Sequence, residues 1–487
     1  MALPKTSKQV LWEGSCLPSA EDVNQSHSAM NWCIQKKIMH TVIPCLFAFL
    51  ITFGTSVSGP ALPSLMADFN ISQTTAVLST TVYTEGLAVG PLLLAPLSEV
   101  YGRRWVYIGA STCLLAFCAG AGAAQTFVAF IVCRFLGGCL GSVGIAIGGG
   151  TLADLWPVGE KRGAALLVFL LVSFLAPCVA PITASYALEA HHEDWRWTQW
   201  LILMVGLPIW LLTLSMQETG EEGLKNQKEP GRRALLIRSV SLPFRLIYSD
   251  RITLLLSIHT AFGYGVVFSF LMSFKYVLTS QYHFNNREAS LSYLSHVLGY
   301  VLAIMLCASI DRISGGTGCP EKALYGSVAG GILLLLGEIW YAVAAHLEAR
   351  WPILVAAGIS VSFGAFALFL STMLYISRIY PTGIVSSVIA ANGALRYMFG
   401  AIFPLFTVQM YERLGTAWAS GAFALLSLLF VPIPIVLCKY GKYYRLSQAM
   451  AWVLVIGNAL NQKLKQSYIY LNHGSEKSKV LTYVQKS

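Results

Sequence analysis

The sequence predicts an all-α integral membrane protein with twelve transmembrane helices in two halves of six. The chain has 487 residues, of which 55% are hydrophobic and only 11% are charged. A soluble domain carries about twice that fraction of charge. Twelve apolar segments are long enough to cross the hydrocarbon core, which takes roughly 20 residues of helix. One polar, charge-rich segment, Gln217–Arg251, separates the sixth apolar segment from the seventh.

Each predicted span is an apolar run of helical length with polar residues at its ends. The sixth run is short, and we expect it to extend back over Thr198 and Gln199. The composition of the runs excludes a transmembrane β-barrel, whose strands would appear as alternating segments of about 10 residues. The twelve runs are Ile38–Gly59, Thr75–Leu97, Val106–Ala123, Phe127–Leu152, Ala164–Leu188, Trp200–Met216, Ile252–Phe274, Leu291–Ile310, Ala323–Ala345, Ile353–Ile376, Val385–Val408 and Trp418–Leu437.

The chain therefore divides into five segments. Paired halves around a polar loop are typical of transporters built from repeats, which bind their substrate between the halves near the bilayer midplane. The apolar run Met450–Leu460 is too short to span, and an interfacial helix and an unstructured tail both stay open. The segments are a cytoplasmic N-terminal tail (1–37), a six-helix half (38–216), a cytoplasmic central loop (217–251), a second six-helix half (252–438) and a cytoplasmic C-terminal tail (439–487).

The net charge of +10 reflects membrane topology. With the N-terminus in the cytoplasm, 26 of the 33 Lys and Arg residues fall in cytoplasmic segments and five fall outside, which is the positive-inside pattern. Nucleic-acid binding is not predicted, because that would need clustered basic residues in a soluble domain. We expect both termini in the cytoplasm and the protein in the plasma membrane, with the vacuolar membrane as the alternative.

The sequence lacks the motifs of an enzyme, a metal site or an ATP-driven pump. It has no GxxxxGK[ST] phosphate loop, and its eleven cysteines form no CxxC or His-Cys cluster. We expect no cofactor, and a monomer whose partners are the lipid bilayer, protons and a small-molecule substrate. Asn70 begins a glycosylation sequon, but it lies so close to the second span that we expect no glycan there.

A charged turn follows the second span at once. The stretch from Gly90 reads GPLLLAPLSEVYGRRW, and it places Glu99, Gly102, Arg103 and Arg104 between two apolar helices. A tight glycine turn with one acid and two arginines can pair with neighbouring helix ends in one state and release them in another. The pattern predicts a latch on the cytoplasmic side.

The fourth span carries one embedded charge and a stripe of small residues. Glycines at positions 137, 141, 144 and 148 fall on one helix face, and small residues let helices approach closely in lipid. Arg134 lies one turn earlier on the same face, so it should point into the bundle. We interpret it as a functional residue, and the alternative is an arginine that extends to the outer interface. Asp154 closes this helix on the inner side, where a solvated helix end is the alternative to a role in the latch.

Glu85 lies at the middle of the second span. A lone ionised carboxylate there is costly, so the group must be protonated, paired or hydrated. This position predicts a proton or cation site, and a structural interhelical hydrogen bond is the alternative. Glu338 is a second embedded acid toward the outer end of span 9, beside Trp340, where extension to the interface explains it as well as function does.

Prolines and polar residues mark three other spans. Pro177 and Pro181 in span 5 should kink that helix and free backbone carbonyls. Asn392 and Arg396 in span 11 are four residues apart and share one face, and mid-span Arg396 needs an embedded acid or an anionic substrate as its partner. We assign Tyr264 in span 7 to the same substrate cavity, although ordinary packing also explains a tyrosine there.

These motifs resemble those of the major facilitator superfamily, and in particular the fungal twelve-span drug:proton antiporter branch. The resemblance rests on PLSE-x-YGRR, on Arg-x-x-x-Gly-x-x-x-Gly from Arg134, and on AANGALRYMFGAIFPLFTVQMYERLGTAWA in span 11. It covers Ile38 to Ser447 and implies the major facilitator fold. It ties Arg134 to proton coupling, and it implies a charge network of Asp154 with the acid and the two arginines of the turn.

The chain departs from this branch at two places. The antiporter motif Gly-Pro-x-x-Gly-Gly keeps only Pro177, which weakens the inference of export. Fungal relatives usually have an apolar residue at the position of Glu85 and often carry a glutamate in helix 7, where this chain has Met272. The proton-binding acid has moved across the cavity, or the substrate has changed.

The sequence therefore favours a secondary transporter that exports a small amphipathic organic compound, such as a toxin, a drug or a secondary metabolite, in exchange for protons. Glu85 would take the proton and Arg134 would tune its pKa. The alternative is proton-coupled or facilitated uptake of a small nutrient. A membrane sensor that does not transport ranks last, because the central loop and the tails are too short and polar for a folded cytosolic domain.

Overall fold

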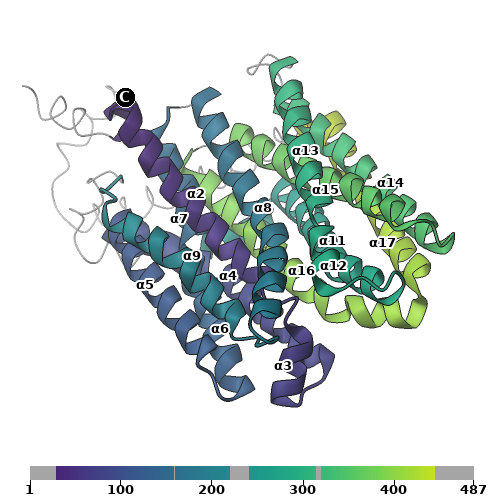
Figure 1. Ribbon diagram of the computed structural model, residues 1–487. Coiled ribbons are helices and arrows are strands. Elements are labelled where there is room, and N and C mark those ends of the chain that lie inside the picture. Colours follow the sequence, from purple (N-terminus) through teal and green to yellow (C-terminus); the bar gives the residue numbers. More distant parts are fainter. Residues whose placement is uncertain (1–28, 158–159, 220–240, 314–319, 381, 445–487) are drawn as a thin grey trace, which may run out of the picture.

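The computed structural model describes residues 29–157, 160–219, 241–313, 320–380 and 382–444, and within these ranges every regular element is a helix (Figure 1). Twelve helical segments in this part of the chain are long and apolar enough to cross a membrane. The all-helical, twelve-span prediction is confirmed. Apolar runs of this length become helices because helices satisfy their own backbone hydrogen bonds in lipid.

The first six spans form one group of packed helices, the N-terminal group. It begins after a short 3-10 turn, Ala29–Asn31. The sixth span starts at Trp197, so it includes Thr198 and Gln199 as predicted. The helices are α2 (Ile34–Ser56), α3 (Leu62–Phe69), α4 (Gln73–Tyr101), α5 (Arg103–Gly122), α6 (Phe127–Gly141), α7 (Val143–Leu155), α8 (Glu160–Ala190) and α9 (Trp197–Leu214).

The last six spans form the C-terminal group. A helix over residues 241–249 leads into it. A 3-10 segment, η3 (Pro320–Leu324), precedes the ninth span. The helices are α11 (Arg251–Ser280), α12 (Asn286–Leu291), α13 (Leu294–Ile313), α14 (Tyr325–His346), α15 (Trp351–Ile379), α16 (Thr382–Leu414), α17 (Thr416–Phe430) and a final helix over residues 432–444.

Three features differ from the sequence-based expectation. Most helices are longer than their apolar runs, because polar turns at the ends continue the helix. The fourth span is divided at Ser142 into α6 and α7. Short helices α3 and α12 form between the predicted spans. The apolar run Met450–Leu460 lies outside the described residues, so its alternatives are not tested.

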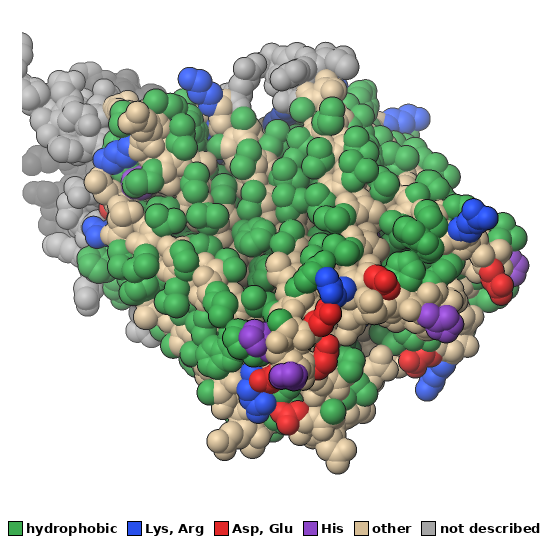
Figure 2. All heavy atoms as spheres, in the orientation of Figure 1, with side chains coloured by type: hydrophobic (Ala, Val, Ile, Leu, Met, Phe, Trp, Pro, Cys, Tyr) green, Lys and Arg blue, Asp and Glu red, His purple; other side chains and the backbone are tan. Residues whose placement is uncertain are grey.

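The two groups lie side by side, the N-terminal group in purple to teal and the C-terminal group in green to yellow (Figure 1). We call the end of the molecule that carries the α4–α5 junction at Gly102 the turn face. The end that carries α3 and α12 is the opposite face. Hydrophobic side chains cover a broad band of the surface between the two faces (Figure 2), as expected for a wall in contact with lipid.

Glycine allows the helices around the fourth span to pack tightly. A Cβ at Gly144 would lie 2.8 Å from the Cβ of Phe47, and one at Gly148 would lie 2.6 Å from the ring of Phe169. A Cβ at Gly138 would lie 2.2 Å from the backbone oxygen of Tyr83. The predicted glycine stripe is therefore a packing surface: Gly144 and Gly148 face α2 and α8, and the other two glycines face Leu114 of α5. The neighbouring Gly138 brings α4 into contact.

Candidate functional site

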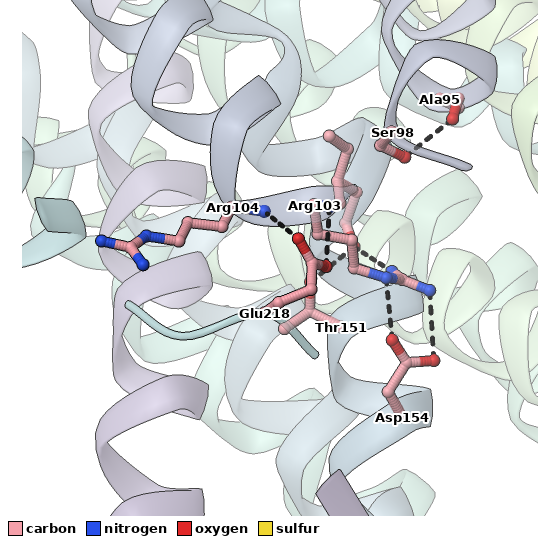
Figure 3. Close-up of polar contacts among 8 residues, drawn as sticks. Ala95, Ser98, Arg103, Arg104, Thr151, Asp154 and Glu218 are labelled. Atoms are coloured by element: carbon pink, nitrogen blue, oxygen red, sulfur yellow. Dashed lines mark hydrogen bonds and ion pairs between the residues drawn. The ribbon is translucent and has the colours of Figure 1, made fainter. Parts of the chain in front are cut away.

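The charged turn forms a bidentate ion pair between α5 and α7. Arg103 Nε lies 2.8 Å from Asp154 Oδ2, and Nη2 donates to Oδ1 at 3.1 Å. The two carboxylate oxygens face the guanidinium side by side (Figure 3). This parallel arrangement is the strong form of an arginine–carboxylate contact, and it ties the start of the third span to the end of the fourth.

Two glycines make this geometry possible. Gly102, between α4 and α5, has φ +90° and ψ 152°, a conformation found almost only in glycine. A Cβ at Gly150 would lie 2.1 Å from Arg103 Nη1, so the guanidinium passes directly over α7 at that residue. There Nη1 donates to the backbone oxygen of Ile147 at 3.2 Å.

Glu218 completes the turn, and the sequence analysis did not identify it. Its Oε1 accepts from the backbone N–H of Arg103 at 2.9 Å, and Oε2 accepts from that of Arg104 at 3.4 Å. A carboxylate at a helix N-terminus satisfies free N–H groups and complements the helix dipole. Glu218 follows the last span of the N-terminal group, too far in sequence from the turn for a local motif to reveal the contact.

Of the charge network predicted for the turn, the structure shows the pair of Arg103 with Asp154. Arg104 does not reach Asp154; its side chain points the other way (Figure 3) and donates to the backbone oxygen of Leu214 at 3.4 Å. The prediction that Arg104 pairs with Asp154 is therefore wrong, because consecutive residues at a helix start project in different directions. The side chain of Glu99 lies outside the described residues.

Arg134 is fully enclosed by the N-terminal group, with 2% of its surface exposed. Its Nε donates to the backbone oxygen of Ser79 at 3.0 Å, and Nη2 donates to that of Gly54 at 2.7 Å. The guanidinium also lies over the ring of Tyr83, 4.2 Å from the centroid. The arginine points into the bundle as predicted, and two backbone carbonyl oxygens accept hydrogen bonds from its guanidinium group.

Glu85 lies on a different side of α4 from Arg134. It is two residues from Tyr83, which places the two side chains about 200° apart around the helix. Thr81, one turn from Glu85, donates to the backbone oxygen of Ala401 on α16 at 3.0 Å. Glu85 is half-buried beside this contact between the groups and forms no hydrogen bond or ion pair with a described residue. The structure does not bring Glu85 and Arg134 together.

The two prolines of span 5 lie inside the long helix α8. Pro181 lacks the N–H that would bond to the carbonyl of Pro177, four residues earlier. Ser56 on α2 supplies the missing donor, and its Oγ lies 2.8 Å from that oxygen. The prolines free a backbone carbonyl as expected, and this carbonyl accepts a hydrogen bond that joins α8 to α2.

Tyr264, Asn392 and Arg396 meet where α11 packs on α16. Arg396 lies over the ring of Tyr264, 4.9 Å from the centroid. Asn392 Nδ2 donates to Thr260 Oγ1 at 2.7 Å. The structure brings these three predicted cavity residues together, and it adds Phe369, whose ring centroid lies 4.5 Å from the guanidinium carbon of Arg396.

The second embedded acid is enclosed by protein. Glu338 is 2% exposed and accepts from Ser427 Oγ at 2.6 Å, between α14 and α17. Extension of this side chain to the membrane interface is therefore wrong. Glu338 packs within the C-terminal group, and no described residue of the N-terminal group forms a hydrogen bond with it.

Among the described residues, five hydrogen bonds join the two groups, and they lie on the side toward the opposite face. Two are between side chains of α8 and α12: Ser185 and Ser290 oxygens are 2.6 Å apart, and Arg287 Nη1 lies 3.0 Å from Glu189 Oε1. The other three are Thr81 to Ala401, Gln409 to Thr74 at 2.7 Å, and Lys275 to the backbone oxygen of Gly59 at 3.4 Å. These hydrogen bonds therefore connect the two groups at a distance from the turn face.

Comparison with known proteins agrees with this architecture. A family model described as Major Facilitator Superfamily matches residues 45–404. The efflux pump radE of Floropilus chiversii is 30% identical over 447 residues, which cover 85% of this chain and 82% of that protein. Polyamine transporter 4 of Saccharomyces cerevisiae is 28% identical over 495 residues, covering 91% and 73%.

Solved structures have the same fold. The crystal structure of the human organic anion transporter MFSD10 superimposes with a TM-score of 0.62 and 15% sequence identity. The match covers 82% of this chain and 99% of that chain. At this level of identity the likeness concerns the arrangement of the helices.

Proposed function

Because the chain belongs to the major facilitator superfamily and is a secondary transporter, not an enzyme, we propose that it exports a small amphipathic organic compound in exchange for protons. Transport would proceed by alternating access, in which the N-terminal and C-terminal groups rock against each other around a central site. The toxin, drug or secondary metabolite predicted from the sequence is a substrate of this kind.

The observation that carries this proposal is the position of the contacts between the groups. The five hydrogen bonds described above connect the two groups toward the opposite face, whereas the Arg103–Asp154 ion pair at the turn face joins two helices of the N-terminal group. A rocking transporter needs contacts between its halves that hold one face closed and can break when that face opens. Opening the opposite face would require the pair Arg287–Glu189 to break.

The sidedness follows from charge. Basic residues are concentrated in the sequence segments that adjoin the helix ends of the turn face, and by the positive-inside rule this supports a cytoplasmic position for that face. In this orientation the structure is closed toward the outside. A substrate from the cytosol would enter from the turn face and reach the cluster of Tyr264, Asn392 and Arg396.

Glu85 is the proposed proton carrier. It is a half-buried carboxyl group in the middle of a span, beside the contact of α4 with α16, and it has no ion-pair partner among the described residues. Protonation would remove the cost of a charge at that depth. The changing contact of the two groups would expose the carboxyl group to each side in turn. Arg134 would act by fixing α4 against α6.

Export is favoured over uptake by the similarity to a protein named as an efflux pump. The alternative, uptake of a small nutrient, is favoured by one observation: the antiporter motif of span 5 retains only Pro177. The two directions predict opposite metabolite patterns. Deleting the gene in its native host and profiling cells and medium by mass spectrometry would distinguish them.

A compound retained in the cells and missing from the medium would establish export and identify the substrate. Slower removal of a compound from the medium would establish uptake and contradict the proposal. The identified substrate would then be tested in proteoliposomes with an imposed pH gradient. We expect Glu85→Gln to abolish pH-driven transport, and the matched change Glu338→Gln to leave the proton dependence intact. Normal pH-driven transport by the Glu85→Gln protein would rule out Glu85 as the carrier.

A further inference from the structure

The guanidinium of Arg396 has aromatic neighbours and no anion. Three rings surround it, those of Tyr264, Phe369 and Tyr397, with centroids 4.9, 4.5 and 4.6 Å from the guanidinium carbon. Arg396 is 8% exposed, and its Nε is buried without a hydrogen-bond partner. No carboxylate in the described part of the chain lies within the 4.0 Å ion-pair distance of this side chain.

The other embedded arginine gives the contrast. Arg134 lies over one ring, but it also donates to two backbone oxygens, those of Ser79 and Gly54. Arg396 donates to no backbone oxygen of the described residues, and its polar neighbour is the hydroxyl group of Tyr397. Cation–π contacts are attractive, yet they offset only part of the cost of removing a guanidinium from water. Arg134 therefore has backbone acceptors for two of its three nitrogens, its Nη1 being buried without a partner, whereas no such backbone acceptor is found for Arg396 among the described residues.

A second polar atom on the same face of α16 also lacks a partner. Asn392 Oδ1, one turn from Arg396, is buried without a hydrogen bond. Its orientation is set by Thr260, whose Oγ1 gives its own hydrogen to the backbone oxygen of Leu256 at 2.9 Å and so can only accept from Asn392 Nδ2. The amide oxygen is therefore left to receive a donor from elsewhere.

Aromatic rings extend this site across the boundary between the groups. Phe174 on α8 of the N-terminal group lies 5.8 Å from Tyr264 and 5.0 Å from Phe369, measured between ring centroids. Gly400 lets Tyr264 lie flat against α16, because a Cβ there would be 2.8 Å from the tyrosine ring. Rings from both rocking groups therefore line one apolar region next to the unpaired charge.

We propose that Arg396 and Asn392 form the polar half of a substrate site for lipophilic organic anions, with the rings of Phe174, Tyr264 and Phe369 as its apolar half. The guanidinium binds a carboxylate or similar acid in a two-pronged contact. Asn392 Oδ1 accepts a hydroxyl or N–H of the same molecule, about one helical turn away. A polycation, as the name of the yeast relative would suggest, is disfavoured because it would meet a like charge.

This inference rests on the proposed transport function and names its substrate class. The test is binding to the purified full chain in detergent by titration calorimetry. The probes share one ring system: 6-hydroxy-2-naphthoate, 2-naphthoate, the uncharged 2-naphthamide and the cationic 2-naphthylmethylammonium. We expect the wild-type protein to bind 2-naphthoate at least about tenfold more tightly than the amide or the cation, as one buried charge pair would give. The hydroxylated acid should bind more tightly still.

Variants separate the contributions of the site. Arg396→Gln should remove the preference for the acid over the amide, and Arg396→Lys should keep part of it. Phe369→Leu, which leaves the charge, should weaken all four probes without changing their order. Asn392→Leu should remove only the gain from the hydroxyl group. Elution as a single species in size exclusion and an unchanged unfolding temperature would show that each variant is folded.

The proposal is overturned if wild-type protein binds none of the probes, if it prefers the amide or the cation, or if Arg396→Gln keeps the full preference for the acid. Failure of the proposed function gives a different result. In that case acid binding and its dependence on Arg396 persist, but an imposed pH gradient drives no transport of 2-naphthoate into inside-out proteoliposomes.

Discussion

Ser56 on α2 donates its hydroxyl hydrogen to the backbone oxygen of Pro177 on α8, across 2.8 Å of the protein interior. That oxygen is free because Pro181, one turn later, has no N–H to give. A sequence feature that weakens one helix is thus converted into a bond between two helices. Within lipid or buried protein, no water is available to replace Ser56 if it is removed.

We therefore expect Ser56→Ala to destabilise the folded protein by about 1 kcal/mol, the usual net cost of a lost internal hydrogen bond. The measurement is thermal unfolding in detergent. Ser79→Ala is the matched control, since Ser79 is also buried but its Oγ has no hydrogen-bond partner. The control should be neutral. Equal losses for both variants would contradict the bond to Pro177 as the cause.

The Arg103–Asp154 ion pair gives a prediction about gating. Arg103→Gln should slow transport strongly, because it removes both contacts with the Asp154 carboxylate and the hydrogen bond to Ile147. Arg104→Gln should have a much smaller effect, since the neighbouring arginine points away from Asp154. Initial transport rates in proteoliposomes would decide this. Equal losses for the two variants would mean that net charge of the turn matters and the pair does not.

A double variant at the opposite face tests the rocking motion. The hydroxyl oxygens of Ser185 and Ser290 are 2.6 Å apart, between α8 and α12. Cysteines at both positions should form a disulfide under an oxidant, because their side chains already meet. We expect oxidation to stop transport and reduction to restore it. Each single cysteine variant should be insensitive to the oxidant. Full transport by the cross-linked protein would refute opening at this face.

Much of the fold could be predicted from the sequence because it depends on one-dimensional patterns. Runs of apolar residues define the spans, and the charge of the turn marks one face. Arg134 could be placed inside the bundle because the glycines of its helix define the packed side. These inferences use only spacing along a single helix.

The contacts of the site could not be predicted in the same way. Glu218 reaches the turn from more than one hundred residues away in sequence, and Phe174 reaches Tyr264 from the other group of helices. Neither residue carries a local signal. Glu85 and Arg134 were assigned to one task because both are embedded charges. The structure separates them because Arg134, on α6, contacts α4 at Ser79 and Tyr83, whereas Glu85 projects from another side of α4.

The last prediction concerns Gly102, which has two independent reasons to be glycine. Its φ of +90° is strained for any residue with a side chain, and a Cβ would lie 2.4 Å from Glu218 Oε2. We expect Gly102→Ala to destabilise the protein by about 2 kcal/mol or more, the range for a residue held in such a region.

Thermal unfolding of Gly102→Ala, Glu218→Ala and the double variant separates the causes. The clash disappears in the double variant while the backbone strain remains. The double variant should therefore be less destabilised than the sum of the two single variants, yet still less stable than Glu218→Ala alone. If the double variant matched Glu218→Ala, the clash would be the whole effect and the left-handed backbone at Gly102 would carry no strain.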